Sequence, residues 1–338
     1  MGELSRSPSK PVSDQPLLPT AMPVRLRQRR PTADPGPLSD ATGQLTVAIE
    51  TRLANLDSQI ASVRRLLVQP AIHDPPVAIG PGNSCPTVSC LGPFCFRLGG
   101  APIDDWRSGK ARALFQFLVN HRGQPIPRDT LIQALWPDPV AAAPGTSLKV
   151  AVHLLRNVIA RTESTVGEKV PMEIVSQGSC YQLNAANLWL DVEEFERCYA
   201  LGHSYEAQGQ PTDALALYVR AAELYRGDYL EDLADDWPTF RREALKDQFL
   251  FIVARLAAAA ADAGDYQSGI VWCQRLLAKD RCREDTYRTL MLCHARLGQR
   301  SRVRSWYDLC VRTLRTELDC PPEPKTERTY RLALQGKL

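Results

Sequence analysis

A repeat of 34 residues in the last third of the chain constrains the fold more than any other feature. Gly264 and Gly298 are separated by this interval, and so are Trp272 and Trp306. A repeat of this length has room for one pair of helices, and a single pair leaves one apolar face uncovered. The period therefore predicts stacked helix pairs that bury a continuous core and leave a concave surface for partners.

The predicted stack occupies residues 187–338, which are helical nearly to the end. An earlier pair of helices, over residues 193–208 and 212–226, has a similar pattern of small and aromatic residues. Thirty-four residues is the period of tetratricopeptide repeats, so we expect a tetratricopeptide-like domain. Glycine, proline and aspartate mark the expected breaks between helices at residues 209–211, 227–228, 264–265, 280–281 and 298–299.

The preceding stretch, residues 90–186, has a mixed pattern. Strands are expected first, over residues 91–98 and 102–104, and then three helices over residues 108–120, 129–135 and 146–159. Two more strands, residues 169–175 and 180–183, flank a glycine-containing turn. This order is that of a winged helix-turn-helix. The expected fold class is therefore mainly α, with a small α+β winged helix followed by the helical repeats.

The front of the chain differs in composition, because 14 of the 26 prolines lie in the first 93 residues. Residues 1–40 are expected to be a disordered tail, and residues 70–89 a linker. Residues 41–69 between them predict an amphipathic helix with apolar residues at nearly heptad spacing. A homodimer seam through residues 45–67 and packing on the rest of the chain are both open for this helix.

The third helix of the winged-helix region carries the candidate site. Leu148, Val152 and Leu155 define its buried face. Arginine and lysine donate to guanine or phosphate, asparagine pairs with adenine, and valine contacts the thymine methyl group. The position of this helix before a two-stranded wing favours entry into a major groove. The residues expected to face double-stranded DNA are Ser147, Lys149, Val150, His153, Arg156 and Asn157.

Three further side chains are candidates for contacts outside the bases. Lys110 and Arg112 begin the first helix, where they would bind the phosphate backbone. Gln177 lies at the tip of the wing and would contact a phosphate or the minor groove. A solvated surface position is the open alternative for each of them.

No pattern indicates an enzyme, a cofactor or a metal. The glycines around Gly109-Lys110 lack P-loop spacing, the five histidines form no metal-binding motif, and there is no CxxC pair. The chain has no signal peptide pattern and no apolar run long enough for a membrane span. We therefore expect a cytoplasmic protein that has no contact with a membrane and whose ten cysteines are reduced thiols.

Several motifs resemble a known family. The winged-helix region is similar to the OmpR-like DNA-binding half of SARP-type antibiotic regulators at residues 107–114 (RSGKARAL), 131–137 (LIQALWP) and 154–156 (LLR). The second half resembles the bacterial transcriptional activator domain at residues 191–195 (DVEEF), 222–230 (AELYRGDYL), 283–291 (REDTYRTLM), 295–299 (ARLGQ) and 324–326 (PKT). The resemblance departs at Leu154, where such helices often carry a polar or basic residue.

The resemblance implies a transcription regulator, usually an activator, that binds repeats near a promoter and recruits RNA polymerase. The outward face predicted for the third helix agrees with sequence-specific DNA binding. The formal net charge of only +3 and the apolar Leu154 leave an alternative open. In that alternative the chain is a tetratricopeptide scaffold whose winged helix binds protein.

Overall fold

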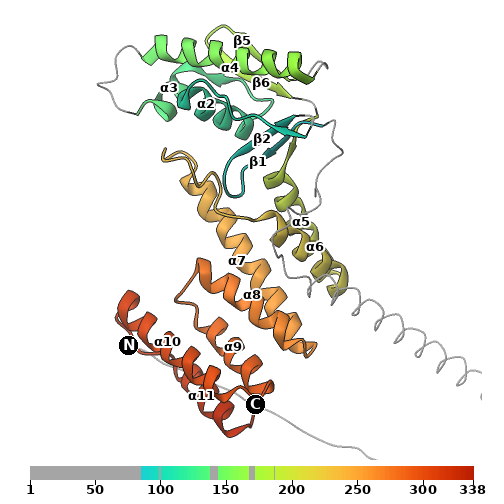
Figure 1. Ribbon diagram of the computed structural model, residues 1–338, viewed down its shortest axis with the longest axis vertical. Coiled ribbons are helices and arrows are strands. Elements are labelled where there is room, and N and C mark those ends of the chain that lie inside the picture. Colours follow the sequence, from blue (N-terminus) through green and yellow to red (C-terminus); the bar gives the residue numbers. More distant parts are fainter. Residues whose placement is uncertain (1–84, 99, 138–143, 167–171, 186) are drawn as a thin grey trace, which may run out of the picture. The chain divides into compact units, whose positions relative to one another are not determined.

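The computed structural model describes residues 85–98, 100–137, 144–166, 172–185 and 187–338, and Figure 1 shows the order of their helices and strands. The predicted tail, the heptad-like helix with its homodimer seam, and the linker up to residue 84 lie outside the described residues. Within the described residues, the strands all precede residue 191 and everything after it is helical or loop. This confirms the expected fold class, a winged helix followed by helical repeats.

A four-stranded sheet opens the winged-helix region. It consists of β1 (Thr87–Ser89), β2 (Cys95–Leu98), β3 (Ala101–Pro102) and β7 (Trp189–Leu190), in the order β3-β2-β1-β7. β1 is antiparallel to β2 and parallel to β7, so Val88 lies opposite both Phe96 and Leu190. All three side chains are buried. The sheet therefore joins the start of the region to its end, about 100 residues later.

Two details of this sheet differ from the sequence prediction. β1 lies within the stretch predicted to be linker, and the strand expected from residue 91 begins only at Cys95. The cause is a turn at Gly92, which has a φ of 109° and whose N–H donates to the carbonyl of Asp228 at 3.1 Å. A Cβ on Gly92 would lie 3.2 Å from the backbone nitrogen of Gly227. Residues 90–94 therefore form the turn between β1 and β2, in contact with the second half of the chain, instead of the start of a strand.

Three helices follow, as the sequence predicts: α2 (Gly109–Asn120), α3 (Arg128–Leu135) and α4 (Pro144–Val166). Ser108 caps α2 by accepting a hydrogen bond from the backbone N–H of Lys110 at 3.2 Å. The apolar face of α2 is buried against α4, and its Phe115 packs against an aromatic cluster of Phe94, Phe96 and Trp106.

The wing is a β-hairpin of β5 (Met172–Gln177) and β6 (Cys180–Ala185), which pairs with the short strand β4 (Ile126–Pro127) in the order β4-β6-β5. The turn between β5 and β6 contains Gly178 with a φ of 57°. The strand β5 is the outer strand of this sheet, so one of its edges has no strand partner among the described residues.

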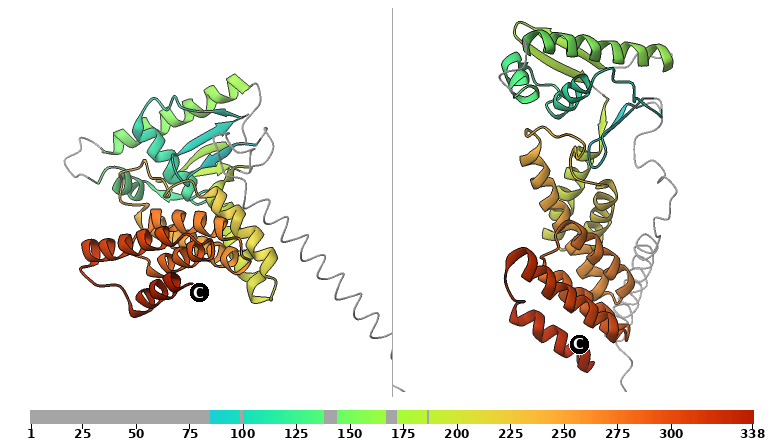
Figure 2. Two further views of the ribbon diagram at one scale, coloured as in Figure 1. Left: turned by 60° about the horizontal axis from the view of Figure 1, so that its bottom comes forward. Right: turned by 60° about the vertical axis from the view of Figure 1, so that its left-hand side comes forward.

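The second half of the chain is a series of seven helices: α5 (Asp191–Ala207), α6 (Pro211–Leu224), α7 (Thr239–Asp262), α8 (Tyr266–Lys279), α9 (Glu284–Arg296), α10 (Arg300–Leu318) and α11 (Pro324–Gln335). Each packs on its neighbour along the chain, as the labels in Figure 1 and the turned views in Figure 2 show. Gly264 and Gly298 end α7 and α9 with φ of 77° and 72°. The 34-residue period thus marks equivalent turns in successive helix pairs.

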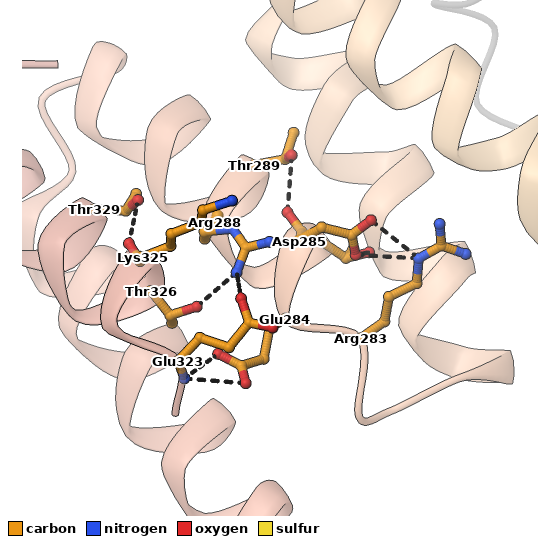
Figure 3. Close-up of polar contacts among 10 residues, drawn as sticks. Arg283, Glu284, Asp285, Arg288, Thr289, Glu323, Lys325, Thr326 and Thr329 are labelled. Carbon is orange, nitrogen blue, oxygen red and sulfur yellow. Dashed lines mark hydrogen bonds and ion pairs between the residues drawn. The ribbon is translucent and has the colours of Figure 1, made fainter. Parts of the chain in front are cut away.

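The last helix, α11, is held to α9 by a polar cluster shown in Figure 3. The guanidinium of Arg288 donates to the hydroxyl of Thr326 at 2.9 Å and to the carboxylate of Glu323 at 3.1 Å. The carboxylate of Glu284 accepts from the backbone N–H of Glu323 at 2.9 Å. These contacts fix the start of α11, whose buried residues Thr326 and Ala333 face the stack.

The ten cysteines form no disulfide. No helix among the described residues is both long enough and apolar enough to cross a membrane. In the same residues, no three histidine, cysteine, aspartate or glutamate side chains gather in a way that suits a metal ion.

Candidate nucleic-acid interface

The helix α4 is seated by its apolar face. Leu148, Val152 and Leu155 are at most 3% exposed and belong to the main hydrophobic core. The helix packs on α2, α3 and β5. Leu154, which departs from the family pattern, is half-buried against the same core. Its apolar character therefore has a packing role.

The opposite face of α4 is exposed where the sequence predicts it. The side chains of Lys149, Val150 and His153 are exposed, and Val150 is 53% accessible. Lys149 forms no ion pair with any described residue. One helical turn after His153, the half-buried Asn157 places its amide nitrogen 3.1 Å from Nε2 of His153. The structure thus brings a cation, an apolar side chain and two hydrogen-bonding groups onto one surface, with Ser147 half-buried at its start.

The sixth predicted residue of this face, Arg156, has partners within the protein. Its Nη2 donates to the carbonyl of Ile174 at 2.8 Å and to the hydroxyl of Ser176 at 2.8 Å. Its Nε donates to the same carbonyl of Ile174 at 3.2 Å. Both partners belong to β5, so the guanidinium bridges the helix to the wing.

Gln177 lies at the tip of the wing, where the sequence places it. It is the last residue of β5, it is exposed, and it pairs with Cys180 across the turn. Its side chain is therefore accessible at the end of the hairpin that follows α4.

The structure places Lys110 and Arg112 against the second half of the chain. Arg112 donates to the carbonyl of Phe94 at 3.2 Å and forms an ion pair with Asp232. The ammonium of Lys110 donates a hydrogen bond to the carbonyl of Leu135 and lies 3.8 Å from the carboxylate of Asp235. Binding to phosphate stays an untested prediction for both residues, and we leave them out of the interface that we propose. The acidic residues were visible in the sequence, but their position opposite α2 was not.

Further contacts between the two halves lie next to these ion pairs. The side-chain oxygen of Asn120 at the end of α2 accepts from the hydroxyl of Tyr229 at 2.8 Å and from the guanidinium of Arg241. Arg122 donates to both carboxylate oxygens of Glu193 at 2.8 Å. The sequence does not reveal these pairings, because the two residues of each pair are separated by 70 residues or more.

Asp191, the first residue of α5, is a buried link between the halves. Its carboxylate accepts from the backbone N–H groups of Cys90 at 2.8 Å and Leu91 at 3.0 Å. Only 4% of Asp191 is exposed. Burial raises the pKa of this carboxyl to about 6, although the backbone N–H groups of Leu91 and Cys90 oppose the rise. The motif that begins with this residue thus includes a structural anchor for the loop before β2.

Comparisons with known proteins identify one domain model and several transcriptional regulatory proteins that this chain resembles. Residues 190–334 match the family model of the bacterial transcriptional activator domain. The transcriptional regulatory protein MoaR1 of Mycobacterium tuberculosis is 27% identical over 248 residues, which cover 72% of this chain and 78% of MoaR1. The transcriptional regulatory protein EmbR of Mycobacterium bovis is 25% identical over 236 residues, which cover 69% of this chain and 59% of EmbR.

The fold also resembles a solved structure. Mycobacterium tuberculosis EmbR in complex with a low affinity phosphopeptide has a TM-score of 0.58 and 22% sequence identity, covering 75% of this chain and 66% of that one. At this identity the likeness concerns the fold alone. Residues 190–334 thus match a domain model of transcriptional activators, and the relatives that resemble the whole described chain are named transcriptional regulatory proteins. These similarities agree with the resemblance of the motifs to SARP-type regulators.

Proposed function

We propose that this chain binds double-stranded DNA sequence-specifically near promoters, in the cytoplasm, and activates transcription by recruiting RNA polymerase. The observation that carries the proposal is the outward face of α4. Lys149, Val150 and His153 are all exposed there, opposite a fully buried apolar face. The helix lies between the first two helices and a two-stranded wing, which is the arrangement that presents a recognition helix to a major groove.

The chemistry of this face suits base edges. Lys149 is placed to donate to guanine or to a phosphate, and the amide of Asn157 can pair with adenine. Exposure of the apolar side chain of Val150 to water is unfavourable, and contact with a thymine methyl group would remove this apolar surface from water. In this proposal α4 recognises the base sequence, and Gln177 contacts the neighbouring phosphate backbone or the minor groove.

Selection of bound genomic fragments by the purified full-length protein at moderate salt tests the proposal first. Enriched fragments that share a repeated sequence support it and provide the probe for the next step. Folded protein that enriches no fragment contradicts it. That result favours the alternative, a repeat scaffold whose winged helix binds protein.

Charge-matched variants then locate the interface. Lys149→Gln is expected to weaken binding to the selected fragment and to lower the slope of log affinity against log salt by about 1. Lys325→Gln removes an exposed lysine from α11 and serves as the control, with affinity and slope like wild type. Equal effects of the two substitutions would place the interface elsewhere.

Activation is tested separately, by transcription in vitro from a promoter that carries the selected repeats. RNA polymerase with the wild-type chain is expected to yield more transcript than polymerase alone. Lys149→Gln should remove this gain in proportion to its loss of DNA binding. A chain that binds the repeats and lowers transcription is a repressor, and that result would overturn the activator part of the proposal.

A further inference from the structure

Unlike Lys149 and Val150 on the outward face of α4, Arg156 forms hydrogen bonds with the wing. Both nitrogens that donate, Nε and Nη2, bind the outer strand β5 of the wing. Nη2 also reaches the side chain of Ser176, two residues along the same strand. A charged donor that serves a backbone carbonyl and a hydroxyl at 2.8 Å is among the stronger hydrogen-bonded contacts.

The strand β5 is held at its start by the buried side chains of Met172 and Ile174 and along its length by pairing with β6. Its last two residues, Ser176 and Gln177, are exposed and pair with β6 on one side only. The turn that follows Ser176 and Gln177 is exposed, and the carbonyl of Ser179 in it accepts a hydrogen bond from the backbone N–H of Arg128 at 2.8 Å. Arg156 adds a side-chain contact that joins β5 to α4 just before the tip of the wing.

These contacts compete with base reading by the same side chain. Recognition of guanine by arginine uses two guanidinium nitrogens on one edge of the base. In Arg156 the Nε–Nη2 edge is occupied by Ile174 and Ser176, which leaves Nη1. Bidentate reading would require Arg156 to release both bonds from Nη2 or to turn away from the wing.

We infer that Arg156 is a positioning residue, which locks the wing to the recognition helix so that Gln177 and α4 meet DNA in a fixed relation. The consequence for DNA rests on the proposed function. The lock itself is a property of the free protein. The inference replaces the role of base reader that the sequence suggested for this residue.

Hydrogen exchange of the full-length protein without DNA tests the lock. Arg156→Ala is expected to speed amide exchange in β5 and β6 near the turn about tenfold, the change expected when hydrogen bonds from a charged group are lost. Arg156→Lys should restore part of the protection, because one ammonium can still donate to the carbonyl of Ile174. Lys149→Ala, on the same helix and with no bond to the wing, is the control and should leave exchange unchanged.

A double-mutant cycle on the selected DNA tests the consequence. Arg156→Ala is expected to weaken binding about tenfold and Ser176→Ala about threefold. The double variant should be no weaker than Arg156→Ala alone, because both substitutions break one contact. Hydroxyl-radical footprints should show that Arg156→Ala loses protection by the wing and keeps protection around α4.

Two results would overturn the inference: wing exchange in Arg156→Ala that equals wild type, or losses of affinity that add in full in the double variant. Either result would return Arg156 to direct contact with DNA. If the wild type binds no fragment, the proposed function fails, and the exchange measurement still decides whether the lock exists.

Discussion

The buried carboxyl of Asp191 makes the stability of this chain depend on pH in a way that one substitution can isolate. Its pKa rises from 3.8 to about 6 on folding, because burial disfavours the charged form. A tenfold change in an acidity constant corresponds to about 1.4 kcal/mol. Ionised Asp191 therefore lowers the free energy of unfolding by about 3 kcal/mol at neutral pH, relative to a group that stays neutral.

The sign of the dependence follows from which state binds the proton more tightly. The folded chain does, so this contribution to stability is complete below about pH 4 and falls as pH rises through about 6. Between pH 5 and pH 7.5 the loss is about 1 kcal/mol. Asp191→Asn cannot ionise. It should keep one backbone hydrogen bond to the loop at Cys90 and Leu91 and lack this part of the pH dependence.

Urea unfolding of wild type and Asp191→Asn at pH 5 and pH 7.5, followed by circular dichroism, measures the difference. The free energy of unfolding of wild type minus that of the variant should fall by about 1 kcal/mol between the two values of pH. Taking the difference removes other titrating groups, such as His294, whose pKa burial lowers. A difference that is the same at both values would refute the assignment of the raised pKa to Asp191.

Two further predictions concern the helical repeats. Gly298→Ala should destabilise the chain by about 1 kcal/mol, because the residue has a φ of 72° while an added Cβ would meet no other atom. Gly202→Ala should destabilise it more, because the added Cβ would lie 2.4 Å from the ring of Tyr218. Thermal unfolding of both variants checks the order, and the reverse order would contradict it. Arg288→Leu should speed hydrogen exchange in α11 and leave α5 and α6 like wild type, since its bonds join only α9 and α11; slower or equal exchange in α11 would contradict the role of this arginine.

The sequence predicts those parts of the fold that depend on neighbouring residues. The turns at Gly264 and Gly298 follow from a period that is visible without any partner, and both have the positive φ that favours glycine. The buried and exposed faces of α4 follow from helical spacing alone, and Leu148 and Val150 lie on the expected sides. In each case the information lies within one or two turns of chain.

The parts that were missed depend on residues far apart in the chain. The strand β1 has three residues and is a strand only because it pairs with β2 and with β7, about 100 residues later. Helical spacing predicts that Arg156 lies on the outward face of α4. It does not predict the hydrogen bond to Ile174, because that bond depends on how β5 packs beside the helix. Likewise, nothing near Arg112 in the sequence indicates Asp232. Helical periodicity assigns a face, and tertiary packing decides which charges on that face remain available.

That distinction leads to a prediction about how the chain would bind DNA. Most of the basic residues described in the winged-helix region are engaged within the protein, through ion pairs such as those of Arg112 and Arg122 or through the wing contact of Arg156. Lys149 is exposed and forms no ion pair with any described residue, and Arg97 and Arg128 share this property. Each phosphate neutralised contributes about −0.9 to the slope of log affinity against log salt.

We therefore expect a slope of about −2 to −4 for each bound chain on its selected fragment, from titrations between low and moderate salt. With so few charges released, discrimination between sites would have to come from base contacts on α4 and from the fixed position of the wing. Specific binding should then survive salt that removes binding to unrelated DNA. A slope steeper than about −6 would show that further cations contact phosphate when DNA binds, either those now paired within the protein, such as Arg112 and Lys110, or those outside the described residues.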